Sequence, residues 1–211
     1  MTSTMFNFHS IRKKVNFKNL NWLMYLLIFI FLSGLAAGAF CVKKTDNYII
    51  KAVCESYMDY LFKKFTLNSV SVFLNTLLLT STAIIFSYFI GLCAIGIPFV
   101  MLIPAVSGAL IGIISGFIYE NYLLKGLGYC AILIFPAAAI SVSAIIFSCK
   151  ESLQMSKNML MLLSRGRVKH EQSFKKYNIN FLVYTAIITF ASAIESILTK
   201  LFIGLFDFKI V

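Results

Sequence analysis

The sequence predicts an all-α membrane protein, a polytopic bundle of about five transmembrane helices. Three observations predict this class: 60% of the 211 residues are hydrophobic, only 13% are charged, and the mean hydropathy is +0.87. A soluble domain ordinarily has about 45–50% apolar and about 25% charged residues. Since a helix needs about 20 apolar residues to cross a bilayer, this length accommodates five crossings and leaves little chain for a soluble domain.

The first span is expected at about 22–42, behind a tail at 1–21 that carries four basic residues and no acid. A signal peptide has a shorter apolar core before a small-residue cleavage site. The small residues at 36–39 resemble such a site, but the run is long enough to span. We therefore expect a retained helix, with residues 22–211 forming one transmembrane bundle.

The next segment, at about 48–65, has an amphipathic pattern. Apolar residues such as Ile50, Tyr57 and Leu61 recur at helical spacing, with charged residues between them. The pattern predicts either a helix lying at the membrane interface or a solvated loop helix packed on its own bundle. Both interpretations stay open.

An uncharged stretch predicts the second and third spans. Residues 65–119 include no Asp, Glu, Lys or Arg, which is too long for one crossing and suits two. Gly96 and Pro98 interrupt the stretch, and proline is well placed in the first turn of a helix. We expect spans at about 70–92 and 98–119, joined as an antiparallel hairpin.

The carboxy-terminal part predicts two further spans. A polar turn at 120–125 precedes a fourth span at about 127–149, and a fifth follows at about 179–203. Between them, 150–178 is expected to be a polar loop, with seven basic and two acidic residues.

The charges predict the orientation of the bundle. Five spans place residues 1–21, 93–97 and 150–178 on one side, which then holds eleven basic residues against two acidic ones. Basic loops stay in the cytoplasm, so the amino terminus is expected in the cytoplasm and the carboxy terminus outside. The net charge of +11 thus reflects topology, and we expect the lipid bilayer, not nucleic acid, as the partner of these basic segments.

Glycines at four-residue intervals form two stripes that predict close helix packing. We expect them to pack helices within the bundle; the alternative is that a stripe docks a partner or a second copy in a homo-oligomer. The stripe residues are Gly34, Gly38, Gly108, Gly112 and Gly116.

The three prolines and one acid stand out within the apolar runs. Pro98, Pro104 and Pro136 are candidate helix kinks. Glu195 lies inside the fifth span, where a carboxyl group is costly and should face the interior, be protonated or be paired. It is interpreted either as a hydrogen-bonded clasp between helices, which we favour, or as a proton or ion site.

The sequence has no pattern of an active site. There is no Ser/His/Asp set, no HExxH, no Walker loop and no GxGxxG. The two histidines, His9 and His170, lie in separate basic segments and the five cysteines form no CxxC pair, so we expect no metal and no cofactor. An enzyme is not expected.

Several segments together resemble the stage II sporulation protein M family. They are Leu32–Gly38, Gly91–Pro98, Ser107–Phe117, Ile134–Pro136 and Ala191–Thr199, in matching order from about Leu20 onward. The resemblance implies a polytopic protein of the bacterial cytoplasmic membrane without catalytic residues of its own. The family's sporulation member anchors the engulfment machinery and recruits peptidoglycan-degrading enzymes to the septum.

The expected function is therefore a noncatalytic membrane scaffold that localises cell-wall hydrolases during peptidoglycan remodelling. Its outer surface is expected at 43–68 and 120–126. The alternative is a small transporter or permease-like subunit, because prolines, glycine stripes and an intramembrane carboxyl group are also compatible with moving helices.

Overall fold

The computed structural model describes residues 17–44, 52, 56, 69–165 and 170–202, and these residues are helical apart from a short turn at 93–96. The helices are α1 (Phe17–Lys44), α3 (Ser69–Leu92), α4 (Ile97–Tyr129), the π-helix η1 (Cys130–Ile134), α5 (Phe135–Arg165) and α6 (His170–Phe202). The expected amphipathic helix at 48–65 lies outside the described residues, except for positions 52 and 56.

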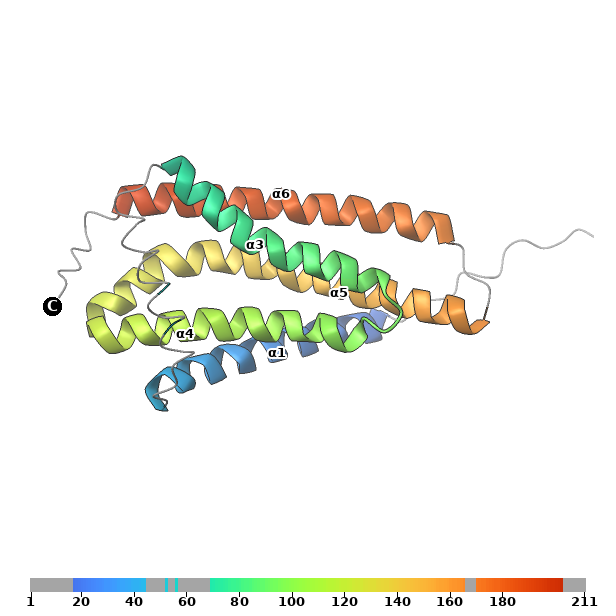
Figure 1. Ribbon diagram of the computed structural model, residues 1–211, viewed down its shortest axis with the longest axis horizontal. Coiled ribbons are helices and arrows are strands. Elements are labelled where there is room, and N and C mark those ends of the chain that lie inside the picture. The colour runs from blue at the N-terminus through green and yellow to red at the C-terminus, as the bar shows by residue number, and fades with distance from the viewer. Residues whose placement is uncertain (1–16, 45–51, 53–55, 57–68, 166–169, 203–211) are drawn as a thin grey trace, which may run out of the picture.

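Five of these helices are long and apolar enough to cross a membrane, which confirms the predicted fold class. They run between two ends of an elongated bundle (Figure 1). The amino-terminal end holds the start of α1 and the α3–α4 turn. It also holds the last turn of α5 and the first turn of α6, which come one after the other in the chain. The carboxy-terminal end holds the last turn of α6 and the junction of α4 with η1.

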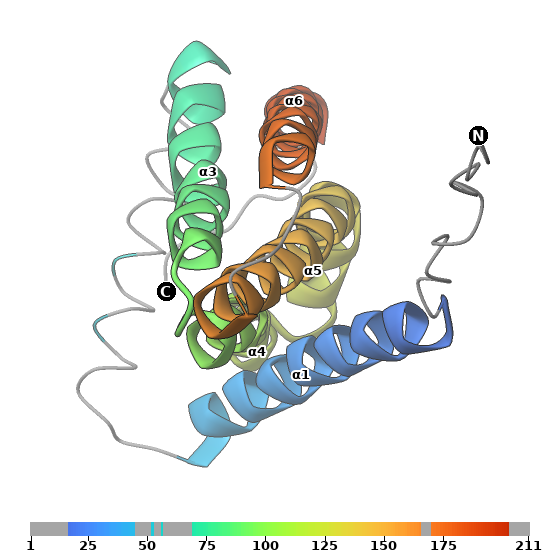
Figure 2. The same ribbon diagram turned by 90° about the vertical axis from the view of Figure 1, so that its right-hand side faces the viewer.

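Helix α5 occupies the centre of the bundle. Seen along the bundle in Figure 2, α3 and α6 lie on one side of α5, and α4 and α1 lie on the other. Helix α1 is strongly tilted and packs mainly against α4. The order of packing therefore follows α1, α4, α5 and then the α3–α6 pair.

The prediction that residues 150–178 form a polar loop is wrong. The structure continues α5 to Arg165 and begins α6 at His170, so only 166–169 lie outside the described residues in this stretch. Hydropathy detects the part of a helix that suits lipid, whereas Glu, Lys, Gln, Met and Leu favour helix whether or not lipid surrounds them. The fourth and fifth spans are accordingly the apolar parts of longer helices.

The turn between the third and fourth spans is made at Leu123. This residue interrupts α4 with a φ of 47° and a ψ of −124°, a conformation that residues with a side chain rarely adopt. Six further residues belonging to α4 then lead into η1 and α5. The predicted polar turn at 120–125 therefore coincides with the reversal of the chain.

The three prolines, which are candidate kinks in the sequence, lie at different positions in their helices. Pro98 is the second residue of α4, where a missing N–H costs no helical hydrogen bond. Pro104 is buried inside α4, yet Leu123 is the residue with non-helical dihedral angles in that helix. Pro136 is the second residue of α5, separated from η1 by Phe135, and a π-turn is one of the devices that accommodates such a break in the α-helical pattern.

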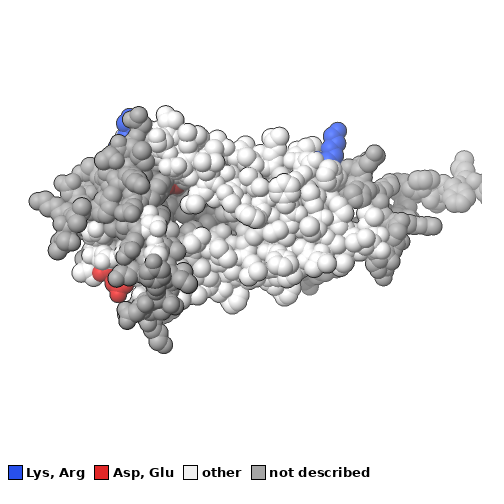
Figure 3. Space-filling view, viewed as in Figure 1, with Lys and Arg blue, Asp and Glu red and all other residues white. Residues whose placement is uncertain are grey.

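The outer surface of the bundle is apolar, as a lipid-facing surface requires. In Figure 3 the charged side chains of the described residues appear only towards the two ends, and the middle of this face carries none. Large exposed side chains recur along one face of α1, and these are Trp22, Tyr25, Phe29, Leu32 and Phe40. The spacing by three and four residues places them on the side of α1 that does not pack against α4.

Candidate functional site

All five stripe glycines meet in one contact between α1 and α4, which we call the glycine seam. A Cβ atom added to Gly34 would fall on the carbonyl oxygen of Ala105, and one added to Gly38 would fall on that of Ala109. The two backbones therefore approach more closely at these points than any side chain would permit.

The seam is reciprocal, because glycines of α4 also face the backbone of α1. A Cβ atom on Gly108 would meet the carbonyl oxygen of Phe31, and one on Gly112 would meet that of Leu35. Gly116 has more room, since its added Cβ atom would lie 3.3 Å from the Cα atom of Ala39. The geometry thus accounts for both stripes by packing within one chain and leaves neither stripe exposed as a docking surface.

A matched pair of variants tests the seam. Gly112→Ala is expected to lower the free energy of unfolding by about 1–3 kcal/mol, because a methyl group there displaces backbone atoms. Gly116→Ala makes the same change in helix propensity, but its methyl group would touch Ala39 without overlapping the backbone of α1. The stability of this variant should therefore stay close to that of the parent. Thermal unfolding in detergent measures both, and equal losses would contradict the seam.

A second feature, the serine–tyrosine cluster, joins α3, α5 and α6 inside the bundle. It consists of Ser87, Tyr88, Ser152, Ser156 and Tyr177. The hydroxyl groups of Ser87 and Ser152 lie 2.8 Å apart, and Ser152 also donates to the carbonyl oxygen of Ser87 at 2.8 Å. The Tyr177 hydroxyl donates to the carbonyl oxygen of Tyr88 at 2.9 Å.

The cluster also closes the amino-terminal end of the bundle. Ser156 donates to the carbonyl oxygen of Cys93 in the α3–α4 turn at 2.7 Å. The rings of Tyr88 and Tyr177 stack at 5.3 Å, and the hydroxyl of Tyr88 donates to Asn178 Oδ1 at 3.0 Å. Three helices and one turn are thereby held in register by hydrogen bonds, of which those between Ser87 and Ser152 are buried and that of Tyr88 to Asn178 is exposed.

Sequence reasoning missed this cluster, although a regularity pointed to it. Ser148, Ser152 and Ser156 repeat every four residues in α5, and all three are fully buried. Gly91 of α3 faces them, since an added Cβ atom would lie 2.8 Å from that of Ser152. Serine and glycine at this spacing form the same kind of small-residue packing as the glycine seam.

A tyrosine pair on α6 tests the cluster. Tyr177→Phe keeps the ring and removes its hydrogen bonds, so the free energy of unfolding should fall by about 0.5–1.5 kcal/mol. The control is Tyr184→Phe, two helical turns further on, whose ring packs on Phe181 and lies outside the cluster. Chemical unfolding in detergent provides the comparison, and an unaltered Tyr177→Phe variant would count against the cluster.

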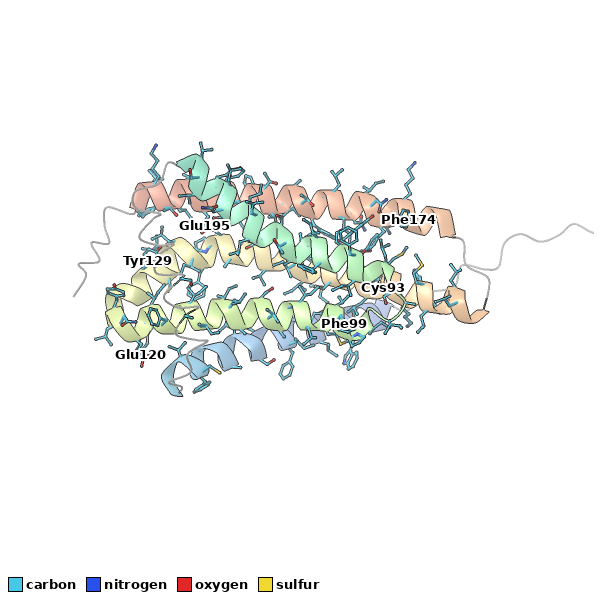
Figure 4. The ribbon with its side chains drawn as sticks, in the orientation of Figure 1. Cys93, Phe99, Glu120, Tyr129, Phe174 and Glu195 are labelled. Atoms are coloured by element: carbon cyan, nitrogen blue, oxygen red, sulfur yellow. The ribbon has the colours of Figure 1, made fainter. Side chains whose placement is uncertain are left out.

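Glu195 lies at the other end of the bundle from this cluster. Figure 4 places it on α6 near the carboxy-terminal end, together with Tyr129 and Glu120, whereas Cys93, Phe99 and Phe174 mark the opposite end. Its side chain is partly buried, and the flanking Ser192, Ser196 and Thr199 are buried. The structure thus places the one acid of the fifth span on a polar stretch of α6 that faces the bundle.

Several hollows open on the surface of the described residues, and two of them are lined by α4. An apolar groove of about 490 Å³ lies between α3, α4 and α5, with Leu79, Phe86, Leu102 and Ile145 among its lining. A pocket of about 460 Å³ lies at the carboxy-terminal end between α1, α4 and η1, where Tyr119, Glu120 and Leu123 line it. Within the described part of the chain, no three His, Cys, Asp or Glu side chains gather as a metal site would require.

Comparison with protein families supplies the identification. A family model described as stage II sporulation protein M matches residues 27–200. The chain belongs to this family. Comparisons with curated proteins and with solved structures find no match.

The family match covers the features that hold the bundle together. It begins at Leu27 in α1 and ends at Lys200 in α6, so the glycine seam, the serine–tyrosine cluster and Glu195 all belong to the stage II sporulation protein M domain. The resemblance that the sequence suggested is therefore confirmed, and the protein is a multi-pass membrane protein of this family.

Proposed function

We propose that this chain is a noncatalytic scaffold of the bacterial cytoplasmic membrane that positions peptidoglycan-degrading enzymes. Membership of the stage II sporulation protein M family over residues 27–200 carries the proposal. The internal contacts are in keeping with a structural role, because the small and buried polar residues of the glycine seam and the serine–tyrosine cluster hold helices together.

The proposal includes an orientation. The basic residues of 1–21 and 150–178 support a cytoplasmic position for the amino-terminal end of the bundle. The carboxy-terminal end, with Glu120 and the reversal at Leu123, then faces the cell wall. A scaffold for cell-wall hydrolases has to present its contact surface on that side.

Single cysteines in a cysteine-free background test the orientation. Glu120→Cys and Lys157→Cys each replace an exposed charged residue, one near each end of the bundle. A membrane-impermeant thiol reagent added to intact cells should label Glu120→Cys, and should label Lys157→Cys only after permeabilisation. The reverse pattern would contradict the proposed orientation.

The carboxy-terminal pocket is the described surface best suited to an external partner. Tyr119 is 51% exposed and Leu123 is 64% exposed beside it, and Glu120 adds a charge to the rim. Exposed aromatic and apolar side chains around a recess are typical of the anchor positions of protein interfaces. We propose that this pocket, together with segment 43–68, which the sequence predicts on the same outer side, receives the hydrolase or a membrane protein that carries it.

Capture from native membranes tests the partner. The tagged protein, solubilised in mild detergent, is expected to retain cell-wall hydrolases that mass spectrometry identifies. Tyr119→Ala should lower their recovery about fivefold or more, as for an interface anchor worth over about 1 kcal/mol.

The matched control is Ile95→Ala, which truncates an apolar residue that is 77% exposed in the turn at the opposite end. Its hydrolase recovery should equal that of the parent. The proposal fails if no hydrolase is retained by the parent protein, or if both variants lose it equally.

A further inference from the structure

The second half of α6 has one polar face that turns towards the bundle. Glu195 and Ser196 are neighbours, and each lies three or four residues from both Ser192 and Thr199, so the four residues share one side of the helix. Ile188 and Ala191, which are buried, continue the same side. We call this stretch the α6 polar face.

Two hydroxyl groups of this face are buried without a partner. Ser192 is 1% exposed and Thr199 is 4% exposed, and neither Oγ of Ser192 nor Oγ1 of Thr199 has a hydrogen-bond partner among the described residues. A buried polar group without a partner costs about 1–3 kcal/mol. Such a group in a native protein calls for an explanation, and a bound water or ion is one of the few available.

The same helix shows that these hydroxyls are exceptional. Thr185 donates to the carbonyl oxygen of Phe181 at 2.9 Å, and Thr189 donates to that of Thr185 at 2.9 Å. Hydroxyl groups in apolar helices ordinarily satisfy themselves in this way. Ser192 and Thr199, which precede and follow Glu195 in the helix, make no such hydrogen bond.

The charge of Glu195 decides which kind of ligand fits. Glu195 makes contacts of its own in the structure, but a carboxylate has about four lone-pair positions, so it can accept further ligands. A negative group with flanking hydroxyl oxygens selects a cation over an anion. One carboxylate balances one positive charge, whereas Ca²⁺ takes about six to eight oxygen ligands, carboxylates prominent among them, so this face suits a monovalent cation.

We propose that the α6 polar face binds a hydrated alkali-metal cation between Ser192 and Glu195. Cβ atoms three or four residues apart on a helix lie about 5–6 Å from each other, and a glutamate side chain leans towards the preceding turn. A carboxylate with this lean would lie on the Ser192 side of Glu195. Ser192 and Thr199 are about 10 Å apart along the axis, so water of the hydration shell, not the ion itself, satisfies Thr199.

Apolar packing lies beyond the polar face at the end of α6. Phe202, the last residue of α6, packs against a buried cluster that includes Ile118, Tyr129 and Leu133. Glu195 remains partly exposed, which leaves it accessible to an entering cation. Ion binding here is independent of the scaffold proposal, since it requires neither a partner nor flux across the membrane.

Thermal unfolding of the purified full-length protein tests the site. The melting temperature is measured in NaCl, in KCl and in choline chloride at equal ionic strength and constant pH. Na⁺ or K⁺ at saturation should raise the midpoint by roughly 5 °C or more over choline, and the two salts show which ion is preferred. Isothermal titration with the effective salt should give saturable binding.

Variants separate the site from a general salt effect. Glu195→Gln, which removes the charge and keeps the shape, should abolish the difference between alkali salt and choline. Glu120→Gln removes an exposed acid at the same end of the bundle and should retain the difference. If Glu195→Gln does not fold, Ser192→Ala serves instead and should weaken titrated binding at least tenfold.

Three outcomes would overturn the proposal. The first is the absence of any alkali-specific shift of the melting temperature in the parent protein, and the second is a shift that persists in Glu195→Gln. The third is a melting temperature that changes with pH in the parent, does not change with pH in Glu195→Gln, and is the same in all three salts. The last result would identify a protonated carboxyl group that acts as a hydrogen-bonded clasp without an ion.

Discussion

Helices in a lipid environment gain no hydrophobic stabilisation from meeting each other, so this fold depends on how closely its backbones approach. The closest approach is the glycine seam, where Gly34 and Gly38 of α1 and Gly108 and Gly112 of α4 each face a carbonyl group of the other helix. Helix α1 has few other attachments and exposes large apolar side chains on its outer side. Without the seam, the apolar side chains of α1 would be as stable in contact with lipid as in contact with the bundle.

The polar groups inside the bundle obey a related constraint, because no water is available to satisfy them. On the α3–α5–α6 side, Ser87, Ser152 and Tyr177 satisfy one another and the backbone. These hydrogen bonds fix the positions of α3, α5 and α6 along one another, which apolar packing alone would not do. At the other end of α6, Ser192 and Thr199 lack such partners. The contrast separates a polar cluster that holds the fold from a polar face that is available to a ligand.

Several parts of this structure could be predicted from residue types and spacing. The first three spans agree closely with α1, α3 and α4, since uninterrupted apolar stretches of bilayer length have one stable arrangement in lipid. The resemblance to the stage II sporulation protein M family, based on glycines, prolines and Glu195, agrees with the match over residues 27–200. Hydropathy failed at 150–178, where α5 and α6 continue as helices beyond their apolar parts.

The sequence by itself determined the membrane class, the number of spans and the stripes of small residues, because these depend on local composition and helical period. Only the tertiary structure decided what each stripe touches. Gly112 and Ser152 both lie on small-residue repeats, yet one meets a backbone carbonyl group of α1 and the other joins a hydrogen-bonded cluster with α3 and α6. The reason is physical: spacing determines which residues share a helix face, whereas the partner of that face depends on how distant helices pack.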